Sequence, residues 1–162
     1  MPDATLPDLN HEFFIHRSIE LAAESRKAGN HPFGALLVSP DSEILMEKFN
    51  TFGEKGDSTD HAERFLMTRA SVTHTVEFLR GCTMYTSAEP CAMCAGSVYW
   101  SGVGRVVHRM SEHDMKEMIG PNPENLTMDI TCRTIFAAGQ RPLEVVGPLL
   151  SEESAVVHKN FW

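Results

Sequence analysis

The sequence has little positive charge and no long apolar run. Its 162 residues include 14 lysines and arginines against 22 aspartates and glutamates, which gives a formal net charge of −8. Affinity for nucleic acid comes largely from basic side chains that neutralise phosphates, so this balance disfavours nucleic acid as a partner and favours small uncharged substrates. No stretch approaches the roughly 20 apolar residues that span a bilayer, which excludes a membrane-spanning protein.

Export features and abundant cysteines are also lacking. The first residues, Met1-Pro2-Asp3-Ala4-Thr5, contain neither the basic nor the apolar region of a signal peptide, so we expect the protein in the cytoplasm. Without an export signal, the four cysteines do not indicate a disulfide framework. Cys82 and Cys132 fall in an apolar and a helical run, and we expect both to be buried packing residues.

What the sequence does contain is typical of a globular domain. Hydrophobic residues make up 42% and charged residues 22%. The length and the absence of repeats or linkers predict one domain over residues 1–162. Helices are expected at 11–28, with Asn10 as the cap, from 61 onward, and at 91–100, 112–119, 131–138 and 152–158. Strands are expected at 35–38, 44–49, 82–87, 104–108 and 143–146, and a polar loop is expected at 51–59. This alternation predicts an α/β fold, and the hairpin of the first two strands makes the sheet mixed.

Two short motifs carry the chemistry. His61-Ala62-Glu63 stands at a predicted helix start, and Pro90-Cys91-Ala92-Met93-Cys94 stands where a strand gives way to a helix. One histidine and two cysteines suit zinc and leave its fourth position to water, which indicates a catalytic site. Zinc lowers the pKa of bound water to about 7. Glu63 could then carry the proton from the water to the leaving group.

Each motif has a simpler interpretation when taken alone. Asp60 and Glu63 could form a capping box at the helix start, with no part in catalysis. Cys91 and Cys94 could be a redox dithiol whose thiol pKa is lowered by the helix N-terminus. The coincidence of five specified positions favours the zinc interpretation over both.

In this order the motifs resemble the cytidine deaminase-like zinc deaminase superfamily, and within it the guanine deaminase and tRNA-adenosine deaminase branch. The resemblance covers roughly residues 11 to 150 and rests on Pro32-Phe33-Gly34-Ala35, Asn50, the histidine motif and residues 86–96. It implies a three-layer α/β/α sandwich on a five-stranded mixed sheet. It also implies that a ring amino group is replaced by oxygen, with release of ammonia.

The resemblance assigns roles residue by residue. His61, Cys91 and Cys94 are implied as zinc ligands, and Glu63 as the proton shuttle. The substrate-binding residues that we expect are Phe33, Asn50, Ala62, Trp100 and Trp162.

The identity of the substrate follows less directly from the resemblance than the zinc ligands do. Phe33 and Trp100 resemble guanine deaminases, whereas the tRNA-acting members usually carry an aliphatic residue in place of Phe33 and lack the tryptophan. Guanine or a related aminated heterocycle is therefore the first expectation. The alternatives are tRNA adenosine, cytosine or a nucleoside, and a non-catalytic zinc-stabilised binding module, which Glu63 disfavours.

One segment departs from the guanine deaminases. They carry an acidic Phe-Asp stretch after the fourth strand, which supplies a second carboxylate near the substrate. Here Met118-Ile119-Gly120 runs directly into Pro121-Asn122-Pro123. We interpret the nearby acidic residues as the solvated face of a helix: Glu112, Asp114 and Glu117.

The chain ends in two adjacent large aromatic residues, Phe161 and Trp162. Left in water they would expose considerable apolar surface, so we expect them to dock. Plain docking on the body of the fold is one interpretation. Our hypothesis is that they cap the pocket near Phe33 and Trp100 in a homodimer, as the resemblance suggests.

Overall fold

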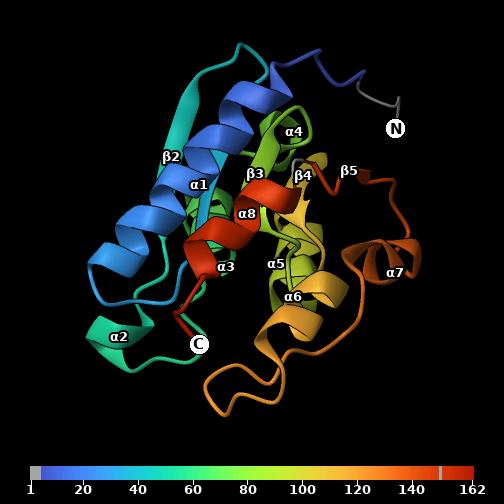
Figure 1. Ribbon diagram of the computed structural model, residues 1–162. Helices are drawn as coiled ribbons and strands as arrows, with labels where there is room; N and C mark the ends of the chain where they lie inside the picture. The colour runs from blue at the N-terminus through green and yellow to red at the C-terminus, as the bar shows by residue number, and fades with distance from the viewer. Residues whose placement is uncertain (1–4, 150) are drawn as a thin grey trace.

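A five-stranded mixed sheet forms the centre of the protein, whose computed structural model describes residues 5–149 and 151–162 (Figure 1). The strand order is β2-β1-β3-β4-β5. β1 pairs antiparallel with β2 and β3, whereas β4 pairs parallel with β3 and β5. The strands are β1 (Gly34–Val38), β2 (Ile44–Phe49), β3 (Thr83–Ala88), β4 (Arg105–Met110) and β5 (Glu144–Val146). The predicted α/β class and five-stranded mixed sheet are confirmed.

Eight helices accompany the sheet in the described residues. They are α1 (His11–Lys27), α2 (Phe52–Lys55), α3 (Ala62–Thr73), α4 (Val76–Leu79), α5 (Ala92–Ser101), α6 (Glu112–Ile119), α7 (Cys132–Ala137) and α8 (Ser151–His158). The six longest were predicted from the sequence. Residues 51–59 were expected to be a loop, but they contain the short helix α2.

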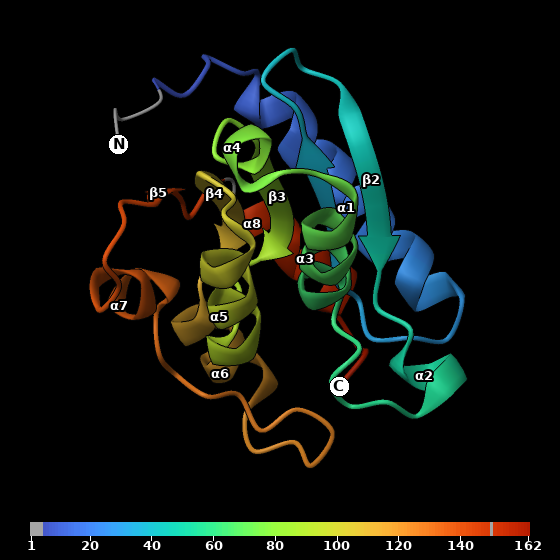
Figure 2. The same ribbon diagram turned by 180° about the vertical axis from the view of Figure 1, so that it is seen from behind.

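Helices cover both faces of the sheet, as Figures 1 and 2 show from opposite sides. α1 and α8 lie on one face, and α3 and α5 lie on the other. Successive side chains of a strand point to opposite faces, and β1 follows this rule. Leu36 packs in the apolar cluster beneath α1, whereas Leu37 packs in the cluster beneath α3 and α5. The alternation fixes both layers on one central sheet.

Local signals in the sequence set several helix ends. The side chain of Asn10 accepts a hydrogen bond from the backbone N–H of Phe13 at 3.1 Å, which caps α1 as predicted. Gly29 then adopts a positive φ of 85°, a conformation that glycine adopts without steric cost.

None of the helices in the described residues has the length and apolar character needed to cross a membrane.

The strand register brings four chain segments to one edge of the sheet. Gly34 at the start of β1 pairs with Phe49 at the end of β2, and Ala35 pairs with Thr86 near the end of β3. β4 ends beside β3, where Ala88 pairs with Met110. The segments that follow β2, β3 and β4 therefore leave the sheet at the same edge, and both predicted motifs meet there.

Candidate active site

The histidine and two cysteines of the motifs converge on one point. The Nδ1 atom of His61 lies 3.6 Å from Sγ of Cys91 and 3.6 Å from Sγ of Cys94. Tetrahedral zinc with Zn–N of about 2.1 Å and Zn–S of about 2.3 Å requires an N–S separation of about 3.6 Å. The three side chains therefore fit a zinc ion in position and in donor chemistry.

Two helix starts hold these side chains in place. His61 is the N-cap residue of α3, and Cys91 is the N-cap residue of α5, with Cys94 one turn further on. α3 and α5 pack against each other through their buried faces. The ligand geometry therefore depends on the packing of two helices that are far apart in sequence.

The two thiols differ in their affinity for a proton. A hydrogen bond from Cys94 and the neighbouring His61 lower the pKa of Cys91 to about 4. The same hydrogen bond and burial raise the pKa of Cys94. Cys91 is therefore a thiolate at neutral pH, which is the form that binds metal.

Glu63 lies beside this group in the first turn of α3. Its carboxylate accepts a hydrogen bond from the Thr86 hydroxyl at 2.8 Å, and its other oxygen lies 3.9 Å from Sγ of Cys94. The side chain is buried, and burial raises the pKa of its carboxyl group. The spacing of two residues between His61 and Glu63 places both near one point because His61 precedes the helix.

The capping-box interpretation of this segment is wrong. The N-cap residue is His61, and Asp60 does not cap the helix. Instead, the carboxylate of Asp60 accepts hydrogen bonds from Thr51 at 2.5 Å and from Lys55 at 2.9 Å. Glu63 is consequently not required for capping and is available to the site.

A cavity of about 300 Å³ opens onto this group, and His61, Cys91 and Glu63 line it. Asn50 lines it as well, and its side-chain oxygen accepts a hydrogen bond from the backbone N–H of Phe52 at 2.9 Å. Phe33 lies on the wall of the cavity, next to the sheet edge. The structure thus places Asn50 and Phe33, which the sequence predicts to bind substrate, in the cavity that His61 and Cys91 also line.

The other three expected residues lie elsewhere. Ala62 is completely buried in the core, and Trp100 is 83% exposed on α5 and does not line the cavity. Trp162 lies behind the cavity wall, where its ring centroid is 6.2 Å from that of Phe33 and 5.1 Å from that of His31. The C-terminus therefore docks near Phe33, as expected, and not near Trp100 of the same chain.

Sequence reasoning missed two acidic residues on the cavity wall. Glu112 was interpreted as part of a solvated face, but it is only 6% exposed and lines the cavity, whereas Asp114 and Glu117 are indeed exposed. Glu124 also lines the cavity, and it contacts His31 at 3.2 Å. The available signal for Glu112 was its position in the first turn after β4, at the edge where the motifs meet.

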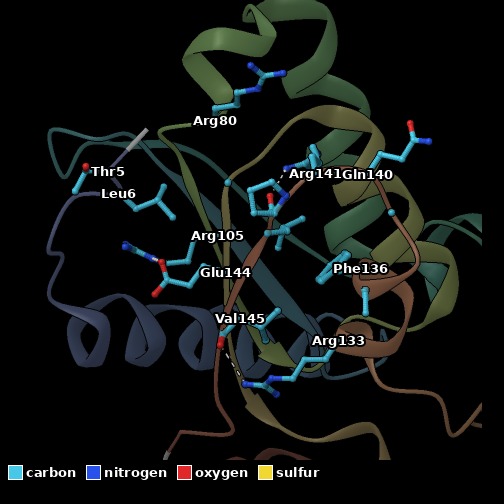
Figure 3. A pocket seen from close by; sticks show the side chains of 15 residues that line it. Thr5, Leu6, Arg80, Arg105, Arg133, Phe136, Gln140, Arg141, Glu144 and Val145 are labelled. Atoms are coloured by element: carbon cyan, nitrogen blue, oxygen red, sulfur yellow. Dashed lines mark hydrogen bonds and ion pairs between the residues drawn. The ribbon is translucent and has the colours of Figure 1, made fainter. Parts of the chain in front are cut away.

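A second and larger cavity, of about 1290 Å³, lies near β5 and α7 (Figure 3). Its lining includes four arginines: Arg80, Arg105, Arg133 and Arg141. Arg105 donates to the Glu144 carboxylate at 2.9 Å, and Arg133 donates to the Val145 and Gly147 carbonyl oxygens. No His, Cys, Asp or Glu group suited to a metal lines this cavity within the described residues.

Comparison with known proteins identifies the family. Residues 9–110 match the family model described as the cytidine and deoxycytidylate deaminase zinc-binding region. A probable cytosine deaminase of Schizosaccharomyces pombe is 36% identical over 151 residues, which cover 92% of this chain and 90% of that protein. The guanine deaminase of Bacillus subtilis is 37% identical over 110 residues, covering 67% and 70% of the two chains.

Solved structures agree with the sequence comparison. The guanine deaminase from Nitrosomonas europaea is similar with a TM-score of 0.72 and 27% identity, over 94% of this chain and 84% of that one. A solved complex with 2,6-diaminopurine gives a TM-score of 0.75 and 27% identity, over 93% and 80% of the chains. The chain belongs to the family of the cytidine and deoxycytidylate deaminase zinc-binding region, and it is a zinc-dependent hydrolytic deaminase.

Proposed function

We propose that this enzyme, a single deaminase domain over residues 1–162, deaminates a free nucleobase and that guanine is its preferred substrate. The observation that carries the proposal is the convergence of His61, Cys91 and Glu63 on one wall of a cavity of about 300 Å³. The guanine deaminase relatives and the complex with 2,6-diaminopurine support a purine in such a cavity.

In this proposal His61, Cys91 and Cys94 hold the zinc, which supplies a water activated for attack at neutral pH. Glu63 would take a proton from that water and pass it to the ring nitrogen beside the reacting carbon. It would then pass the second proton of the water to the amino nitrogen, which leaves as ammonia while the ring carbon gains a carbonyl oxygen. The hydroxyl of Thr86, at 2.8 Å, holds the Glu63 carboxylate in a fixed orientation. A proton shuttle must be placed accurately, because its contribution depends on hydrogen-bond reach to both the water and the leaving group.

Asn50 and Phe33 bind the base in the same proposal. The contact with Phe52 fixes the Asn50 side chain, so that its N–H groups can donate to a ring acceptor. Phe33 packs against the flat face of the ring. Both residues stand on short connections at the sheet edge, where the backbone N–H of Asn50 donates to the Phe33 carbonyl oxygen at 3.0 Å.

Cytosine is the second candidate substrate. The Schizosaccharomyces pombe relative named as a probable cytosine deaminase matches over nearly the whole of both chains, which the Bacillus subtilis guanine deaminase does not. A tRNA-specific adenosine deaminase of Aquifex aeolicus is also related, at 29% identity. The net charge of −8 disfavours an RNA substrate for this chain.

Ammonia release from guanine, cytosine, adenine, cytidine and an RNA stem-loop tests the proposal, with Glu63→Gln protein as the blank. We expect the highest kcat/KM for guanine and the next for cytosine. Release from the RNA stem-loop alone, or from none of the bases, would overturn the proposal.

A homodimer belongs to the same proposal. Trp100 exposes 83% of its surface, and a large exposed indole is typical of a contact with a partner chain. In such a dimer Trp100 could reach the partner's cavity, which would restore its expected contact with substrate. Light scattering should give twice the chain mass for the wild type and a smaller mass for Trp100→Ala.

We also place the enzyme in the cytoplasm, because its four cysteines are free and a reducing compartment keeps them so.

A further inference from the structure

Glu112 is a buried carboxyl group in the active cavity for which the mechanism above has no use. It is the first residue of α6, it lines the cavity, and it is 6% exposed. Its Oε2 atom is buried and has no hydrogen-bond partner among residues 5–149 and 151–162. Buried polar atoms in proteins are almost always hydrogen-bonded, so an unpartnered one on a cavity wall indicates a missing ligand.

The backbone holds Glu112 firmly at this position. Its backbone N–H donates to Oε2 of Glu89 at 2.9 Å, while Oε1 of the same glutamate accepts from the backbone N–H of Cys132 at 2.8 Å. Glu89 thereby ties the start of α6 and the start of α7 to the end of β3. The side chain of Glu112 extends from a fixed point, which is what a group that selects a ligand requires.

The surroundings favour the neutral form of this carboxyl group. Burial, together with the negative groups of Cys91 and Glu63, raises the pKa of Glu112 to about 8. Glu89 acts in the same direction, and His61 opposes it. A protonated carboxyl group has one O–H donor and one carbonyl acceptor side by side.

We propose that Glu112 recognises the lactam edge of the substrate, accepting a hydrogen bond from a ring N–H and donating one to the adjacent ring carbonyl. The proposal rests on the proposed function and narrows its substrate class to free bases that carry this edge. Guanine and free cytosine both present N–H next to C=O. Adenine has no carbonyl, and in cytidine the corresponding nitrogen carries the sugar.

The side chain of glutamine tests this role, because an amide also has a donor and an acceptor side by side. We expect Glu112→Gln to keep the KM for guanine within about threefold of wild type. Glu112→Leu should raise that KM at least about tenfold, because the lactam edge is then left without partners. Glu117→Leu, on the exposed side of the same helix, is the matched control and should change neither kcat nor KM.

Zinc content and thermal melting show whether each variant is folded. If Glu112→Leu does not fold, the substrate supplies the test: 2-aminopurine has the same reacting amino group as guanine but no lactam edge. The wild type should prefer guanine to 2-aminopurine by at least about tenfold in kcat/KM, and Glu112→Gln should keep that preference.

The outcomes separate this inference from the proposed function. If the wild type deaminates no free base, the proposed function fails. If it deaminates guanine, three results would overturn the role of Glu112 alone: an unchanged KM in Glu112→Leu, a KM in Glu112→Gln as high as in Glu112→Leu, or equal use of 2-aminopurine and guanine.

Discussion

Two cavities among the described residues differ in the partners of their charged groups. In the larger one, with its four arginines, Arg105 is paired with Glu144, and Arg141 donates to the carbonyl oxygens of Val98, Tyr99 and Val103. In the smaller one a carboxyl oxygen of Glu112 has no hydrogen-bond partner in the described part of the chain, and three metal-binding atoms face one another. The active site is thus the smaller of the two cavities, and it is distinguished by polar atoms that lack a bonding partner within the described residues.

Three of the four arginines of the larger cavity, Arg105, Arg133 and Arg141, have structural roles. Arg141 lies beyond the C-terminal end of α5, where helix carbonyl groups have no partner within the helix, and its guanidinium satisfies them. Arg133 satisfies carbonyl groups beside the short strand β5 in the same way. The comparison predicts that substitutions in one cavity affect catalysis and that those in the other affect stability.

Loss of a metal ligand should have the largest effect. Cys91→Ser or His61→Ala should remove the zinc, abolish deamination and lower the melting temperature, because metal binding contributes to folding free energy. Elemental analysis by mass spectrometry measures the zinc, an ammonia assay measures deamination, and a thermal melt measures the melting temperature. Cys82→Ala, at a buried cysteine outside the site, is the control and should keep about one zinc per chain. Full activity in zinc-free wild-type protein would contradict the prediction.

Replacement of the proton shuttle should have the next largest effect. Glu63→Gln preserves the shape of the side chain but cannot carry a proton. We expect kcat to fall by roughly 10²-fold or more while zinc content stays at the wild-type level. Glu117→Gln serves as the control on an exposed surface. A kcat close to that of the wild type would leave Glu63 without a catalytic role.

Removal of the C-terminal aromatic residues should lower kcat/KM without abolishing activity. Trp162 packs against Phe33 and His31, both of which line the cavity. Deletion of residues 158–162 should leave zinc content and fold intact and lower kcat/KM at least about tenfold, or roughly 1.4 kcal/mol. Trp162→Ala should show a smaller loss of the same kind.

The alternative for this segment is docking without a functional role. A truncated enzyme that melts at the same temperature and is equally active would disprove the cap. One that merely unfolds would indicate that the C-terminus serves the stability of the fold.

A substitution in the larger cavity should leave catalysis unchanged. Arg141→Met removes a charged donor from the end of α5, which we expect to cost about 1.5–3 kcal/mol of unfolding free energy. The kcat/KM of the folded enzyme should stay within about twofold of wild type. Denaturant melts and steady-state kinetics on the same preparation decide this. A selective loss of kcat/KM at unchanged stability would show that the larger cavity also serves the reaction.

The features that could be predicted from the sequence are those that neighbouring residues along the chain determine. The cap at Asn10, the start of α6 at Glu112 and the spacing of Cys91 and Cys94 are short-range features, and the structure has them where the pattern placed them. Placement of a side chain relative to the cavity is not local. Glu112 and Glu117 are both acidic residues of one helix, and only the packing of α6 against the end of the sheet decides which one is buried.

The same limit applies to the aromatic residues. Trp100 lies on the solvent side of α5, and this orientation depends on the contact between α3 and α5. Phe33 directly precedes β1, whose position is fixed by pairing with two other strands. Its contact with Trp162, at the far end of the chain, therefore cannot be read from the local sequence pattern.

Acidification should have the smallest effect, and it should act through His158 behind the cavity wall. This residue is buried, accepts a hydrogen bond from the Trp162 indole at 3.1 Å, and has its pKa lowered by burial to about 4 from the ordinary 6.5. An unfolded histidine binds its proton below about 6.5, whereas the folded one does so only below about 4. The stabilisation is therefore complete well above pH 6.5 and is lost as the pH falls toward 4, by about 1.4 kcal/mol at pH 5.5.

The fluorescence of Trp162 reports on this loss, and a Trp100→Phe background removes the other tryptophan. In that background we expect Trp162 to become exposed between pH 6.5 and 4, together with a decline in kcat/KM. His158→Gln cannot titrate and should flatten the pH dependence of both signals, while His74→Gln at the end of α3 should not. If the exposure of the half-buried Trp162 indole does not change down to pH 4.5 while His158 is intact, the C-terminus is held by packing against Phe33 and His31 alone, and the neutral imidazole contributes nothing to its docking.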